Sequence, residues 1–161
     1  MKPTGIGGWL VLPAIGLVLT PLVLLKGLVE LLPVFDPEIW QQLTEPGAGA
    51  YHPLWATVVI YELLANVGFL VFTLWLGYLF VRKSSRTPAI FITWLALNIA
   101  IQLVDLLLGA EIPAVADESA AGFGELIRGI IQAIIWIPYF LRSERVRNTF
   151  AVSSTPEPQT G

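Results

Sequence analysis

The stretch PAIFITWLALNIAIQLVDLLL, residues 88–108, decides the fold. It is long enough to cross a bilayer as a helix, yet it carries Asn98, Gln102 and Asp105. At about 100° per residue, these three side chains lie within one narrow stripe of the helix. Lipid solvates neither an amide nor a carboxylate, so the stripe has to face other protein or a wet cavity. The stretch therefore predicts a bundle of membrane-spanning helices around itself.

The composition agrees with a membrane protein. Of the 161 residues, 55% are hydrophobic and only 13% are charged, and the mean hydropathy is +0.73. A soluble domain is about 45–50% apolar and about 25% charged. Four apolar runs are long enough to span a bilayer, at about residues 9–32, 54–81, 88–108 and 120–141. We therefore predict an all-α integral membrane four-helix bundle over residues 1–150, followed by a disordered tail over residues 151–161.

Prolines and one capping pattern add detail to this bundle. Pro13 and Pro21 lie inside the first span and Pro138 lies near the end of the fourth, so we expect both helices to be kinked. The sequence DPEIWQQL, which begins at residue 36, places an N-cap Asp before a Pro and a Glu. It predicts a short helix along the membrane surface in the first loop.

Basic residues predict the orientation of the four spans. Seven of the nine fall in the termini and in the connection between the second and third spans: Lys2, Arg82, Lys83, Arg86, Arg142, Arg145 and Arg147. Neither of the other two loops contains a basic residue. By the positive-inside rule we expect a multi-pass membrane protein with both termini in the cytoplasm.

Polar residues inside the spans share one depth. Counted from the outer end of each span, Lys26, Glu62, Asp105 and Arg128 lie roughly 6–12 Å deep, in the outer half. A lone charge near the bilayer centre costs about 2.5–3.5 kcal/mol, so we predict that Glu62 and Asp105 face Lys26 and Arg128. Amides at similar or greater depth complete the candidate polar cluster of Lys26, Glu62, Asn66, Asn98, Gln102, Asp105, Arg128 and Gln132.

Two interpretations of this cluster stay open. Its members act either as hydrogen-bonding glue between helices or as a ligand or ion site, and Lys26 has a local alternative partner in Glu30, four residues away. The leading functional prediction is an accessory or interaction protein that associates with another membrane component. The alternative is a small-solute or ion carrier, or a sensor. We expect no enzymatic activity, because no catalytic constellation is present.

The residue types of the chain bear on its cofactors, metal ions and partners. It has no Cys and its single histidine is His52, so we expect no cofactor and no metal site. The segment at residues 142–150 is basic with Val146 and Phe150 interleaved, as in a helix lying on an anionic membrane. Contact of its arginines with anionic lipid or with another membrane protein is therefore a second interpretation, beside the positive-inside signal. We expect no nucleic-acid partner.

Three stretches carry a resemblance to a known family. They are GIGGWLVL at residues 5–12, YELLANVGF at residues 61–69 and IWIPYFLRSERVRNTF at residues 135–150. Together they resemble a bacterial four-span membrane family catalogued as domain of unknown function 2569. The resemblance implies four membrane helices in a bacterial cytoplasmic membrane. It implies no activity and no catalytic residues.

Overall fold

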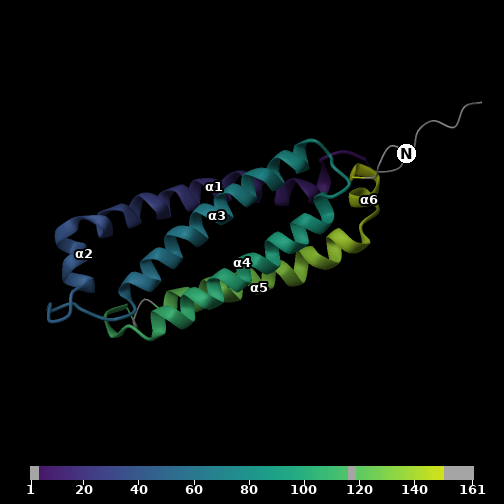
Figure 1. Cartoon of the computed structure of the whole chain (residues 1–161). Coiled ribbons are helices and arrows are strands. Elements are labelled where there is room, and N and C mark those ends of the chain that lie inside the picture. Colours follow the sequence, from purple (N-terminus) through teal and green to yellow (C-terminus); the bar gives the residue numbers. More distant parts are fainter. Residues whose placement is uncertain (1–3, 116–118, 151–161) are drawn as a thin grey trace, which may run out of the picture.

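A computed structural model describes residues 4–115 and 119–150, and every regular element in these ranges is helical (Figure 1). The long helices are α1 (Val11–Leu31), α3 (Trp55–Val81), α4 (Thr87–Ala110) and α5 (Ser119–Arg142). There are also two short helices, α2 (Pro37–Thr44) and α6 (Glu144–Phe150). Three 3-10 turns are η1 (Gly8–Leu10), η2 (Leu32–Phe35) and η3 (Pro113–Val115). The predicted tail at residues 151–161 and Lys2 lie outside the described residues.

Four helical segments are long and apolar enough to cross a membrane. They cover Gly8–Phe35, Trp55–Val81, Thr87–Ala110 and Gly122–Arg142. The prediction of an all-α four-span bundle is therefore confirmed. Helix α1 continues through Pro21 and α5 through Pro138, so these prolines do not end their helices.

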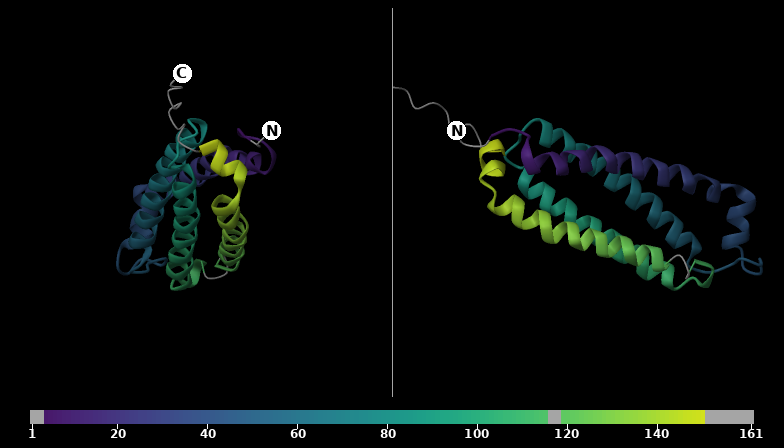
Figure 2. Two further views of the ribbon diagram at one scale, coloured as in Figure 1. Left: turned by 90° about the vertical axis from the view of Figure 1, so that its right-hand side faces the viewer. Right: turned by 180° about the vertical axis from the view of Figure 1, so that it is seen from behind.

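The four long helices pack in chain order. Helix α1 lies along α3, α3 along α4, and α4 along α5, whereas the described parts of α1 and α5 form no extended contact (Figures 1 and 2). The turn between α3 and α4, the start of α1 and α6 all lie at one end, which we call the α6 end. The opposite end carries α2, the end of α4 with η3, and the start of α5, and we call it the α2 end.

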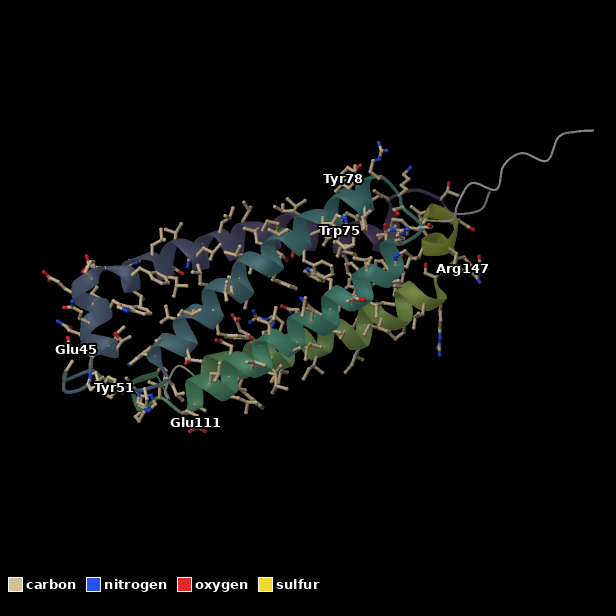
Figure 3. The ribbon with its side chains drawn as sticks, viewed as in Figure 1. Glu45, Tyr51, Trp75, Tyr78, Glu111 and Arg147 are labelled. Carbon is tan, nitrogen blue, oxygen red and sulfur yellow. The ribbon has the colours of Figure 1, made fainter. Side chains whose placement is uncertain are left out.

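Charged side chains follow this division. Glu45 and Glu111 lie at the α2 end, whereas Arg147 lies at the α6 end (Figure 3). At that end the guanidinium of Arg82 also lies 5.9 Å from the ring centre of Tyr78. The arrangement agrees with the four-span topology read from the basic residues.

Aromatic residues fill the half of the bundle nearest the α6 end. Phe91 stacks on Phe140 with ring centroids 4.1 Å apart, and Trp94 stacks on Phe69 at 5.5 Å. The indole N–H of Trp94 donates to the hydroxyl of Thr73 over 2.8 Å, and that hydroxyl donates to the Phe69 carbonyl over 2.7 Å. This half is therefore closely packed and its buried polar groups are paired.

Helix α6 packs its apolar side against the α6 end of the bundle. Val146 is 1% exposed and Phe150 is 3% exposed, and the ring of Phe150 meets that of Phe80 edge to face at 5.3 Å. The Thr149 hydroxyl donates to the Gly5 carbonyl over 3.3 Å, which ties α6 to the N-terminal segment. The predicted membrane-facing apolar side of residues 142–150 is therefore wrong, because that side is buried against the protein's own helices.

The short helix predicted in the first loop is present as α2. The side chain of Asp36 accepts a hydrogen bond from the Glu38 N–H over 3.0 Å, as an N-cap residue does. The ring of Trp40 stacks on that of Phe35, with centroids 5.7 Å apart. These contacts fix α2 against the end of the first span.

Candidate functional site

A cavity of about 460 Å³ lies between the four long helices. Its walls come from α1, α3, α4 and α5 together, and they include seven of the eight residues of the predicted polar cluster: Glu62, Asn66, Asn98, Gln102, Asp105, Arg128 and Gln132. Phe69 lies at its border with the aromatic half of the bundle. The residues predicted to lie at similar depth thus line the same cavity.

Lys26 is the member of the predicted cluster that the structure places elsewhere. Its ammonium nitrogen lies 2.5 Å from the Glu30 carboxylate, one turn along the same helix, and both side chains are more than 60% exposed. The neighbouring residues Leu24 and Gly27 line the cavity instead. The predicted pairing of Lys26 with Glu62 or Asp105 is therefore wrong, because Lys26 finds a local partner on the outer face of α1.

The charges of the cavity differ from the predicted balance. Glu125, on α5, lines the cavity as a third acid beside Glu62 and Asp105. Asp105 is near enough to interact electrostatically with both of the other carboxylates. Arg128 is the one basic residue in the lining, and within the described ranges no acidic side chain reaches it to form an ion pair. Among the described lining residues, three carboxylates and one guanidinium give a formal charge of −2, whereas the predicted set of two acids and two bases sums to zero.

The amides of the cavity are left without protein partners. Among the described residues, none of Asn66, Asn98, Gln102 and Gln132 forms a side-chain hydrogen bond to another residue. The carbonyl oxygen of Gln102 is fully buried and has no hydrogen-bond partner there. A buried acceptor without a partner costs about 1–3 kcal/mol.

A glycine on α5 makes room for two of these amides. A Cβ atom at Gly129 would lie 3.4 Å from the Asn98 amide nitrogen and 3.5 Å from that of Gln102. The amides of α4 therefore lie directly on the α5 backbone. This contact fixes one wall of the cavity.

Two further polar residues line the cavity outside the predicted cluster. Tyr61 lines the cavity, and its hydroxyl donates to the Ile101 carbonyl over 2.9 Å, which joins α3 to α4. Glu125 lies three residues before Arg128 and seven before Gln132, on the same helical face. That spacing was a usable signal for Glu125, whereas nothing in the sequence indicated the partner of Tyr61.

The side chains in the described ranges offer no arrangement for a metal ion. No group of three or more His, Cys, Asp or Glu residues there is positioned to hold one.

Comparison with known protein families finds a matching family. A family model described as a protein of unknown function, DUF2569, matches residues 3–151. The chain belongs to this family. No curated protein and no solved structure matches the chain.

The three stretches that carry the family resemblance have defined places in the fold. Residues 5–12 and 135–150 meet at the α6 end, where the Arg145 guanidinium packs against Gly7 and Gly8. Residues 61–69 form the α3 wall of the cavity. In this member of the family, two of the stretches build the closed end and the third lines the open space.

Proposed function

We propose that this membrane protein binds a small polar solute in the cavity and serves as a carrier or sensor for it. The observation that carries the proposal is that seven polar side chains of the predicted cluster line one cavity without hydrogen-bonding or ion-pairing to one another. Polar groups inside a membrane are costly, so groups that leave one another unpaired favour an external partner.

The role of interhelical glue fits this geometry less well. Glue requires hydrogen bonds from helix to helix, each contributing roughly 0.6–2 kcal/mol. In the described lining of the cavity, the bond from Tyr61 to the Ile101 carbonyl is the one side-chain bond that crosses between helices. The accessory role favoured by the sequence alone assigned no ligand to these residues, and the geometry supports the carrier or sensor alternative better. The proposal contains no catalytic step.

The proposed orientation puts the α2 end outside the cytoplasm of a bacterial cell. Its support is the charge distribution, because the basic turn at residues 82–86 and the arginines of residues 142–147 share the α6 end. The cavity then lies in the outer half of the membrane. Its solute would enter from the extracytoplasmic side.

A stability measurement separates the binding role from the glue role. The Glu62 carboxylate makes no hydrogen bond in the described ranges and lies near the like charge of Asp105. We therefore expect Glu62→Gln to raise the free energy of unfolding in mild detergent by about 0.5–1 kcal/mol, since it removes a repulsion and keeps the side-chain shape. Equilibrium unfolding of the purified variant gives this number.

Tyr61→Phe is the matched control on the neighbouring residue. It deletes the hydrogen bond to Ile101 and changes little else. We expect a loss of about 0.6–1 kcal/mol, the usual value of an interhelical hydrogen bond. If Glu62→Gln lowered stability as much as Tyr61→Phe does, Glu62 would hold helices together and the binding proposal would fail.

A further inference from the structure

The charge of the cavity narrows the class of solute, if the solute-binding function proposed above holds. Glu62, Asp105 and Glu125 come from three different helices, and Asp105 interacts electrostatically with both other acids. The guanidinium of Arg128 stays outside ion-pair distance of any carboxylate in the described part of the chain. Like charges that face one another across a space are stabilised by a cation placed between them.

Hydrogen bonding adds a second requirement. Ionised carboxylates only accept hydrogen bonds, and three of them line the cavity. A primary ammonium group carries three N–H donors and one positive charge. It can donate to two carboxylates at the same time, which a quaternary ammonium cannot do because it lacks N–H groups.

The apolar part of the cavity adds a third requirement. The lining of this part includes Val23 and Leu24 of α1 and Ile101 of α4. The volume of about 460 Å³ falls within the range of small-molecule sites. A solute with a short hydrocarbon body would bury that body against these side chains.

We propose that the cavity binds an aliphatic primary ammonium compound, with its ammonium between Asp105 and Glu62 and its hydrocarbon body along α1. Two sources carry this chemistry. One is a free alkylamine or diamine, and the other is the headgroup of an ethanolamine lipid. A diamine neutralises the formal charge of −2 completely, so it should bind more tightly than a monoamine of equal length.

Four probes of matched length test the class of solute. They are 1,5-diaminopentane, 1-aminopentane, 6-aminohexanoate and 1,5-pentanediol, and the readout is the Tm of the full-length protein in a phosphatidylcholine nanodisc as each probe is titrated. A ligand that binds the native state stabilises it by RT ln(1 + [L]/Kd), so the Tm rises with ligand concentration. We expect a dose-dependent rise with the two amines, larger for the diamine, and none with the diol.

Two amide variants locate the binding in the cavity. Asp105→Asn should weaken the apparent affinity for the diamine about tenfold or more, because one close charge pair is lost. Glu111→Gln changes an exposed acid at the end of the same helix, outside the cavity lining. Its titration should match that of the unmodified protein.

Several outcomes of these titrations would contradict the inference. An equal shift with the diol, or an equal response of Asp105→Asn, means that the ammonium is not recognised. A larger Tm shift with 6-aminohexanoate than with both amines means that Arg128 recognises the carboxylate of the probe. This result would contradict the proposed class of ligand but not the binding of a solute. No shift with any probe or lipid also overturns the amine class, whereas solute binding itself is tested separately by the Glu62→Gln measurement.

A lipid arm separates the two sources of the ammonium group. Nanodiscs of phosphatidylcholine alone are compared with nanodiscs that also contain phosphatidylethanolamine, without soluble amine. A rise in Tm that Asp105→Asn abolishes identifies the lipid headgroup as the ligand. If the Tm is equal in both nanodiscs and the diamine shift persists, the source is the free amine.

Discussion

Replacing Phe150 with alanine is expected to lower the free energy of unfolding by about 3–5 kcal/mol, the usual cost of deleting a buried aromatic ring. Phe150 is 3% exposed, and its ring meets Phe80 of α3 edge to face. The loss would open the packed α6 end, where α6 and the N-terminal segment meet. Equilibrium unfolding in mild detergent, followed by tryptophan fluorescence, measures the change.

Arg147→Ala is the matched control for this variant. Arg147 lies on the same short helix, but it is exposed and its nearest acid, Glu144, is 4.0 Å away. Exposed ion pairs contribute little, so we expect a change below about 0.5 kcal/mol. An equally small effect of Phe150→Ala would mean that α6 lies on the membrane surface, as its sequence pattern had suggested.

The four spans were predictable because hydropathy and length suffice for them. In lipid, the backbone hydrogen bonds of a spanning segment must be made within the protein. An apolar run of about 20 residues that crosses the membrane therefore folds as a helix. The Asp36 cap was predictable for a similar reason, because its signal is local and lies within three residues. None of these features depends on which helices become neighbours.

The cavity was predictable only in part. The stripe of Asn98, Gln102 and Asp105 follows from helical geometry, and all three line the cavity. Depth alone grouped Lys26 with them, but depth does not say toward which side of its helix a residue points. Lys26 lies on the outer face of α1 and pairs with Glu30 instead. Opposite charges at one depth therefore do not establish an ion pair.

Helix α6 shows a second limit of sequence patterns. An amphipathic segment needs an apolar surface to cover its apolar side, and a membrane and a protein end offer the same chemistry. Val146 and Phe150 meet the protein end. Only packing partners distant in the sequence, such as Phe80 of α3 against Phe150, decide between the two surfaces.

The closed end of the bundle has a consequence for the proposed function. The stack of Phe69 on Trp94 lies between the cavity and the aromatic half. The packed rings therefore close the cavity toward the α6 end. A carrier must rearrange these aromatic rings in its transport cycle, whereas a sensor needs no such passage.

Thiol labelling tests the wet cavity most directly, because the chain has no native Cys. Ala65 lines the cavity, and Ala100 lies on the exposed face of α4 outside that lining. Each is ten residues from the end of its helix at the α2 end, at a depth of about 15 Å. Single substitutions Ala65→Cys and Ala100→Cys thus compare two thiols at one depth, one facing the cavity and one facing lipid.

The measurement is the rate at which each thiol in reconstituted vesicles reacts with a cationic or an anionic methanethiosulfonate reagent. Such reagents require a hydrated thiolate, which lipid does not support. We expect Ala65→Cys to react, and to react at least about tenfold faster with the cationic reagent, because the negative cavity concentrates cations. Ala100→Cys should react with neither. If Ala65→Cys proved as unreactive as Ala100→Cys, the polar residues would not line a solute-accessible cavity, and the proposed function would be contradicted.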